Sequence, residues 1–180
     1  SISGLSAGTY SVTVTDGNGC TTSSSAQIGE DCGCSYVTIN SNNFENGYGI
    51  WNEGGNDCSL NSNANYVSSG TYSVQLRDNT NGSVTYTNIL DLSSYEELTV
   101  SFSYITRSMD NSNEDFWLQI STNGGSSYTT VEEWNLNDEF VNEVLYNDQV
   151  VIPGPFTSNV RLRFRCDASG NNDWVYLDDV

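Results

Sequence analysis

The clearest alternation of apolar and polar residues in the chain lies in residues 160–167. The apolar positions are Val160, Leu162, Phe164 and Cys166, and the polar positions between them are Arg161, Arg163, Arg165 and Asp167. A period of two is typical of a β-strand, so the pattern predicts a strand with an apolar face and three arginines on the other face. A polar turn follows, and residues 174–180 form a second predicted strand that ends in Asp178 and Asp179.

Similar short runs recur along the chain, separated by segments rich in Asn, Gly, Ser and Asp. They predict strands over residues 71–78, 83–92, 98–106, 115–122, 127–134, 143–152, 160–167 and 174–180. No segment shows the periodicity of an amphipathic helix. We therefore predict an all-β fold in which two antiparallel sheets pack as a β-sandwich.

Residues 1–30 carry a separate strand pattern. Tyr10, Val12 and Val14 alternate with Ser and Thr, a turn follows over 16–19, and a weaker strand runs to Ile28. The segment LSAGTY is similar to the tyrosine corner of an immunoglobulin-like sandwich, and the whole stretch resembles the tail of the repeats in Bacteroidetes gliding-motility adhesins. The resemblance implies a C-terminal fragment of an Ig-like repeat over 1–30, a linker over 31–39 and a sandwich over 40–180.

Three motifs in residues 40–180, FENGYGIW, SGTYSVQL and VYLDDV, have the order and spacing of a jelly-roll domain. They resemble MAM-type domains and jelly-roll carbohydrate-binding modules. The resemblance implies two four-stranded sheets. In spatial order, one contains the strands over 71–78, 174–180, 98–106 and 143–152, and the other contains those over 83–92, 160–167, 115–122 and 127–134. Jelly rolls serve several functions, so the fold does not determine the ligand.

In this arrangement the arginine strand lies inside the second sheet, and its polar side belongs to one outer face. With the apolar residues assigned to the core, the predicted ligand-binding residues on that face are Thr85, Thr87, Trp117, Gln119, Trp134, Arg161, Arg163 and Arg165. Sugar rings stack on tryptophan, and arginine forms bidentate bonds with carboxylate or sulfate groups.

Two alternatives stay open for this face. The arginines can instead relieve repulsion between acidic neighbours across the sheet. Trp117 can instead be covered by the N-terminal hairpin, because two strands alone cannot bury a core. Arg77 and Arg107 are predicted on the outer side of the other sheet, away from this face.

The resemblance to jelly-roll binding modules also implies a structural calcium ion. Glu45 resembles the glutamate that ligates calcium near the start of such modules, and Asp178 and Asp179 resemble the aspartate pair of their last strand. Neighbouring strand residues point to opposite faces, and Asp179 shares its parity with Val175 and Leu177, so we prefer Asp179 as the ligand. Alternatively, these carboxylates cap turns and stay solvated.

The chain of 180 residues has 23 acidic and five basic residues, a formal net charge of −18, and neither lysine nor histidine. Its negative field argues against binding nucleic acid or an anionic membrane. The commonest catalytic bases are missing. The adjacent acids Glu132 and Glu133, like Asp178 and Asp179, face apart on their strands and cannot act as a pair. We therefore expect no catalytic residues and no enzyme activity.

Five cysteines leave at least one thiol unpaired or paired between chains. Without histidine their spacing fits no four-ligand zinc site, so extracellular disulfides are the better interpretation. We predict a disulfide between Cys58 and Cys166, and a second one between Cys20 and either Cys32 or Cys34.

The chain shows no apolar run long enough to span a bilayer and no signal peptide, and it starts in the middle of a strand pattern. We expect a segment of a larger bacterial protein that is secreted or on the cell surface. The predicted function is non-catalytic binding of polysaccharide, including an acidic or sulfated one, by a module that targets an attached enzyme. The alternative is a structural or adhesive module of a cell-surface protein.

Overall fold

The computed structural model describes residues 8–28 and 36–180. Contacts within the chain divide it into two units, Ser1–Thr38 and Ile39–Val180. In the first unit, strands β1 (Gly8–Thr15) and β2 (Thr21–Ile28) form an antiparallel hairpin. The Asp16 carboxylate holds the turn between them, because it accepts hydrogen bonds from the backbone N–H groups of Asn18 and Cys20 at 2.9 and 2.8 Å.

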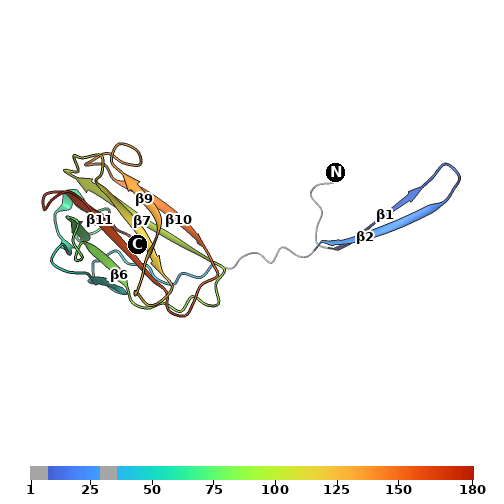
Figure 1. The fold of residues 1–180 in the computed structure, drawn as a ribbon, viewed down its shortest axis with the longest axis horizontal. Coiled ribbons are helices and arrows are strands. Elements are labelled where there is room, and N and C mark those ends of the chain that lie inside the picture. The colour runs from blue at the N-terminus through green and yellow to red at the C-terminus, as the bar shows by residue number, and fades with distance from the viewer. Residues whose placement is uncertain (1–7, 29–35) are drawn as a thin grey trace. The chain divides into compact units, whose positions relative to one another are not determined.

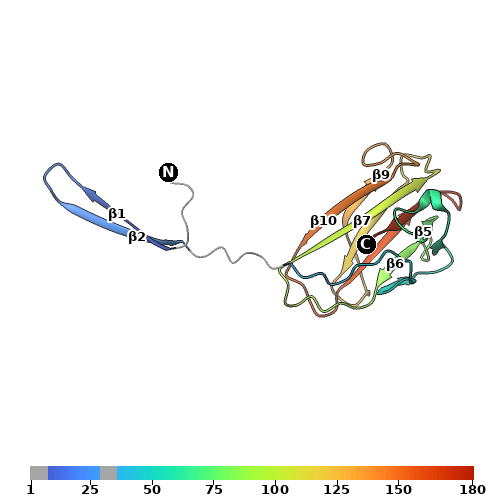
Figure 2. The same cartoon turned by 180° about the vertical axis from the view of Figure 1, so that it is seen from behind.

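The second unit is a two-layer β-sandwich, seen from opposite sides in Figure 1 and Figure 2. Its strands are β3 (Trp51–Glu53), β4 (Cys58–Asn61), β5 (Ser73–Arg77), β6 (Val84–Thr87), β7 (Glu97–Arg107), β8 (Asp115–Ser121), β9 (Thr129–Asn135), β10 (Tyr146–Pro153), β11 (Arg161–Asp167) and β12 (Trp174–Asp178). One turn of 3-10 helix, η1 (Ala64–Tyr66), precedes β5. Across residues 8–28 and 36–180 no helix is long and apolar enough to cross a membrane.

The strands pair as the jelly-roll resemblance implied. One sheet has the order β10-β7-β12-β5-β4 and the other has the order β3-β6-β11-β8-β9. Without the edge strands β3 and β4, these are the two predicted four-stranded sheets in their predicted orders, so the jelly-roll sandwich is confirmed. β3 and β4 have three and four residues, which is too short for an alternation to be recognised in the sequence.

Aromatic side chains fill the space between the sheets. Phe116 and Trp134 stack with their ring centroids 4.8 Å apart, and Phe102 meets Trp134 edge to face at 5.2 Å. Phe164 lies against Phe102 at 4.7 Å. All four side chains are at most 2% exposed. Because β8 and β11 contribute Phe116 and Phe164 to the core, the alternate residues of these strands face outward.

The predicted disulfide between Cys58 and Cys166 is wrong, because both residues are buried free thiols. Cys58 begins β4 at the edge of one sheet, whereas Cys166 lies on β11 inside the other sheet. Both pack into the core as small apolar side chains, and burial raises the pKa of Cys58 to about 11. Cys20 is exposed and has no disulfide partner among the described residues, and its predicted partners, Cys32 and Cys34, lie outside them.

Candidate functional site

The alternation that predicted β11 describes its two faces correctly. Leu162, Phe164 and Cys166 are at most 5% exposed and belong to the core. Arg161, Arg163 and Arg165 are the alternate residues and point outward, each partly exposed. β11 lies between β6 and β8 in the sheet, so its arginines have neighbours on both sides. Figure 1 shows β11 beside β6.

Each of the three guanidinium groups lies over an aromatic ring. The Cζ atom of Arg161 is 5.3 Å from the ring centroid of Tyr86, that of Arg163 is 3.8 Å from Tyr128, and that of Arg165 is 5.5 Å from Trp117. Such contacts are favourable because the ring face carries negative electrostatic potential. The face thus consists of cations and rings in alternation. We call it the arginine face, formed by Tyr86, Trp117, Gln119, Tyr128, Arg161, Arg163 and Arg165.

The chain's other two arginines are arranged in the same way on the opposite sheet. Arg77 lies 5.1 Å from the ring of Trp174 and Arg107 lies 5.6 Å from the ring of Tyr66. Both pair with Trp174 in the strand register, so they occupy the outer side of that sheet as predicted. All five basic residues of the chain therefore contact aromatic rings, and only three of them belong to the arginine face.

Gln119 holds Arg163 in place. Its side-chain oxygen accepts a hydrogen bond from Nε of Arg163 at 2.6 Å, and its amide nitrogen donates to the hydroxyl of Thr130 at 3.0 Å. Gln119 is 6% exposed. Gln119 lies on the predicted face, but its side-chain oxygen and nitrogen are both hydrogen-bonded within the protein. Its role is therefore to position Arg163 and not to contact a ligand.

The arginine face carries positive charge without direct ion pairs. Among the described residues the one ion pair within 4.0 Å joins Arg77 and Asp57. Arg165 donates instead to the side-chain oxygen of Asn79 at 2.8 Å. Burial, followed by the nearby charge of Arg165, lowers the pKa of Arg163 from its usual value. Arg161 and Arg163 thus keep charge that no carboxylate neutralises, which weakens the alternative that the arginines serve to neutralise adjacent carboxylates. Arg165 does act on a nearby carboxylate, that of Asp167.

Three of the predicted ligand-binding residues do not lie on this face. Thr85 and Thr87 are both 1% exposed and point inward, because Thr85 pairs with core Phe164. Thr85 donates to the Asn52 carbonyl at 3.1 Å, and the Thr87 hydroxyl accepts from a β11 backbone N–H at 3.1 Å. Trp134 is 1% exposed and belongs to the core. Their predicted placement on the outer face is therefore wrong.

Two aromatic residues of the face were missed. Tyr86 has the same parity as Val84 on β6, so the sequence indicated a core residue, but its register partner is the outward Arg163. Tyr128 lies just before β9 and belongs to no alternating run. Pairing β6 with β11 in register is the signal that would have found Tyr86. Nothing in the sequence marks Tyr128.

Three carboxylates gather at one end of the arginine face. Asp167 is the next outward residue after Arg165 on β11, and its cross-strand partner on β8 is Asp115. Glu133 lies on β9, where it pairs with Trp117 of β8. Asp115 is 7% exposed, and its Oδ1 is buried without a hydrogen-bond partner in the described structure. We call Asp115, Glu133 and Asp167 the acidic end.

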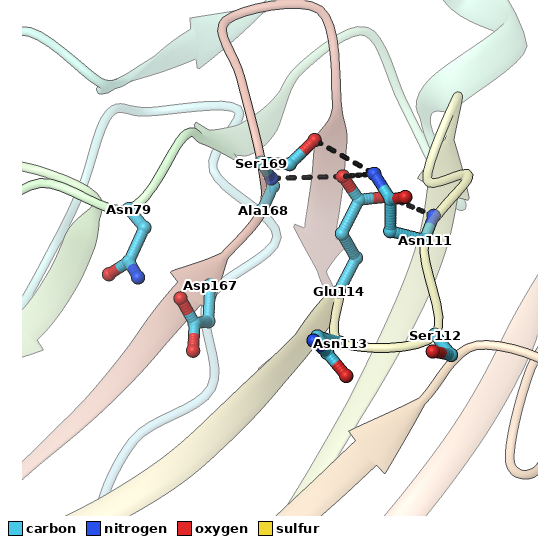
Figure 3. Close-up of a pocket in the computed structure, with 8 residues that line it drawn as sticks. All are labelled: Asn79, Asn111, Ser112, Asn113, Glu114, Asp167, Ala168 and Ser169. Atoms are coloured by element: carbon cyan, nitrogen blue, oxygen red, sulfur yellow. Dashed lines mark hydrogen bonds between the residues drawn. The ribbon is translucent and has the colours of Figure 1, made fainter.

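A shallow polar depression adjoins the acidic end. Figure 3 shows the residues that line it: Asn79, Asn111, Ser112, Asn113, Glu114, Asp167, Ala168 and Ser169. Glu114 joins its two loops, because its carboxylate accepts from the backbone N–H groups of Asp110, Asn111 and Ser169. Asn111 also donates to the Ser169 hydroxyl at 3.2 Å. Among the lining residues, Asn111, Glu114 and Ser169 bond one another, whereas Asn79 accepts from Arg165.

Glu45 fixes the loop before β5. Its Oε1 accepts from the backbone N–H groups of Thr71 and Tyr72, both at 2.7 Å. These two hydrogen bonds lower the pKa of Glu45, and the nearby charge of Asp179 opposes them. Asp179 contacts the same loop, because its Oδ1 accepts from the Ser69 hydroxyl at 2.7 Å.

Asp178 is the buried member of the aspartate pair, at 2% exposed. It accepts from the backbone N–H groups of Ser68, Ser69 and Asp179 at 2.9, 3.1 and 2.8 Å. β12 ends at Asp178, and Asp179 adopts a φ of 49° and is exposed, so the predicted inward position of Asp179 is wrong. No group of three or more acidic or cysteine side chains in the described residues is arranged to hold a metal ion. A cation here would need backbone carbonyls as further ligands.

No protein-family model matches the sequence, and no curated protein sequence matches it either. Solved structures do share its fold. The CBM22-1–GH10 modules of Clostridium thermocellum endo-1,4-β-D-xylanase 10B, complexed with xylohexaose, are 18% identical, with a TM-score of 0.55 over 79% of this chain and 27% of that chain. This chain thus spans about a quarter of that protein's length.

Two further structures match over most of their length. A cleaved adhesin domain of Lys-gingipain from Porphyromonas gingivalis is 17% identical, with a TM-score of 0.57 over 78% of this chain and 95% of that chain. A family 16 carbohydrate-binding module is 18% identical, with a TM-score of 0.51 over 77% of this chain and 93% of that chain. At these identities the likeness establishes the jelly-roll fold.

Proposed function

We propose that the second unit is a non-catalytic module that binds polysaccharide on the arginine face. The observation that carries the proposal is the row of three arginines without carboxylate partners, each over an aromatic ring, on one outer face of the sheet. Rings and guanidinium groups together suit the apolar faces and polar substituents of sugars. The similar structures that are named as carbohydrate-binding modules support the proposal.

We propose that the preferred ligand is acidic or sulfated. Guanidinium groups form bidentate hydrogen bonds with carboxylate and sulfate, and those of Arg161 and Arg163 are not neutralised by a neighbour. The rest of this acidic chain repels anions, so binding depends on the local cluster.

The setting of the module is part of the proposal. One similar structure carries its carbohydrate-binding module and a GH10 module in one chain. By analogy, this chain belongs to a larger secreted or cell-surface protein, and it brings a covalently linked enzyme to its polysaccharide. The similarity to an adhesin domain favours a second candidate, an adhesive module of a bacterial surface protein.

We expect Trp117→Ala to weaken binding to a sulfated polysaccharide about tenfold, because a stacking surface is lost. Binding of the unaltered protein should also weaken as salt concentration rises. Isothermal titration calorimetry against a panel of neutral, uronic and sulfated polymers measures both effects. Arg107→Gln is the matched control, since it removes a ring-stacked arginine from the opposite sheet and should leave affinity unchanged. Binding of neutral polymers alone would contradict the preference for anions.

We further propose a structural calcium ion held by Glu45 and Asp179 together with backbone carbonyls. The support is that both carboxylates bind the same loop, Glu45 through the N–H groups of Thr71 and Tyr72 and Asp179 through the Ser69 hydroxyl. Asp178 is not part of the proposed site, because both of its oxygens accept N–H groups.

We expect a chelator to lower the melting temperature by about 5–10 °C, since an ion that binds the folded state stabilises it. Differential scanning calorimetry with calcium and with EDTA measures the shift. Glu45→Gln keeps the hydrogen-bond acceptor for Thr71 and Tyr72 but removes the charge, so it should abolish the response to calcium. Identical melts with and without chelator would show that no calcium is bound.

A further inference from the structure

The acidic end brings three carboxylates together without enough counter-charge. Asp115 and Asp167 are directly opposite each other on neighbouring antiparallel strands, where like charges repel. Glu133 lies on β9, on the other side of β8, and its charge also acts on Asp115. The one cation nearby is Arg165, which precedes Asp167 on β11 and already contacts Asn79 and Trp117.

Burial makes this repulsion costly for Asp115 in particular. Its side chain is 7% exposed, and Oδ1 has no partner among the described residues. Burial first, and then the charges of Asp167 and Glu133, raise the pKa of Asp115 to about 7. Burial also raises the pKa of Asp167, although Arg165 opposes this. A protonated Asp115 can donate a hydrogen bond to the Glu133 carboxylate. This bond removes the repulsion between the two groups and gives the buried oxygen of Asp115 a partner.

We propose that Asp115 shares one proton with the neighbouring carboxylates of the acidic end, and that this proton sets how far along the arginine face an anionic polysaccharide can bind. The proposal rests on the proposed function of the arginine face. With the proton bound, Arg165 and Trp117 are available to an anionic group. Once the proton is lost, negative charge beside Arg165 repels the ligand, and the anion-binding part of the face contracts to Arg161 and Arg163.

The proton itself can be measured without any ligand. Side-chain carboxyl ¹³C chemical shifts of Asp115, followed by NMR between pH 3 and 9, should titrate with a midpoint near 7. Asp167→Asn should lower that midpoint, because it removes the like charge directly across from Asp115 on β11. A midpoint near 4 in the unaltered protein, the usual value for an aspartate, would overturn the inference.

The effect on specificity is measured with dextran sulfate at constant ionic strength, because its sulfate groups keep their charge throughout the range. The chain has no histidine, so few other side chains titrate between pH 5.5 and 8. We expect affinity to fall about three- to tenfold from pH 5.5 to 8, as one added negative charge near the ligand would cause. Asp115→Asn should bind equally well at both pH values.

Glu97→Gln is the matched control, because it makes the same change of charge at an exposed position of β7 in the opposite sheet. It should keep the pH dependence of the unaltered protein. Affinity that stays constant with pH while Asp115 titrates near 7 would overturn the link between proton and ligand. Absence of binding at either pH would instead overturn the proposed function, whereas the NMR titration would still decide whether the proton is held.

Discussion

Replacing Trp134 by alanine is expected to lower the free energy of unfolding by about 3–5 kcal/mol, because it leaves a large cavity in a rigid core. The ring is 1% exposed, stacks on Phe116 and meets Phe102 edge to face. Its indole N–H also donates to the Asp148 carboxylate at 2.7 Å, which links β9 to β10 on the opposite sheet. Urea denaturation followed by circular dichroism measures the loss.

Trp134→Phe separates the two contributions. It keeps an aromatic ring against Phe116 but removes the hydrogen bond to Asp148, so we expect a smaller loss, on the order of 1–2 kcal/mol. Neither variant should change polysaccharide affinity while the protein stays folded, because Trp134 lies beneath the sheet. An alanine variant of unchanged stability but reduced affinity would restore the ligand-binding role that the sequence suggested.

Replacing Glu114 by alanine is expected to cost about 2–3 kcal/mol, because it leaves three part-buried backbone N–H groups without their acceptor at once. Its carboxylate accepts the backbone N–H groups of Asp110, Asn111 and Ser169, and it is 2% exposed. Burial alone would raise its pKa, but hydrogen bonds from Ser169, Asn111 and Asp110 outweigh burial and lower the pKa of Glu114. Thermal and urea unfolding measure the effect, and Glu96→Ala, at an exposed position, should change stability by less than about 0.5 kcal/mol.

The lowered pKa gives this prediction a pH signature. A carboxylate whose pKa is lowered by folding contributes stability above its unfolded pKa of about 4.3, and that contribution is lost as the pH falls below it. The difference in unfolding free energy between the unaltered protein and Glu114→Gln should therefore shrink between about pH 5 and pH 3. A difference that stays constant over this range would show that Glu114 acts through packing and not through its charge.

The strand order was predictable because the sequence carries both alternation and recognisable motifs. Residues 160–167, which contain β11, show four apolar and four polar residues in strict alternation, and a strand that is buried on one face admits one register. The Asn- and Gly-rich separators then bounded most of the other strands within a few residues, although β6 ends at Thr87 and not at the predicted residue 92. β3 and β4 were not predicted, because three or four residues give no measurable period.

The errors at the candidate site come from assigning inward and outward positions by simple alternation along each strand. On β6, Val84 and Tyr86 look like the core set, yet the alternate residues Thr85 and Thr87 face inward, where their hydroxyls bond to backbone groups. On β9, a bulge inserts Val131 between the residues opposite Leu118 and Gln119. It turns Trp134 into the core, although simple alternation placed it outside. Neither feature is visible in one strand considered alone, because both depend on its neighbour.

The stacking of every arginine on a ring divides the four tryptophans into two optical classes. Trp51 and Trp134 are at most 4% exposed, whereas Trp117 and Trp174 are partly exposed beneath guanidinium groups. Indole fluorescence shifts to longer wavelength in polar surroundings, so the second pair emits separately from the first. A molecule that displaces the guanidinium above Trp117 changes that emission and leaves the core pair unaffected. With Trp174 replaced by phenylalanine, the chain would report events at the arginine face through its own fluorophore.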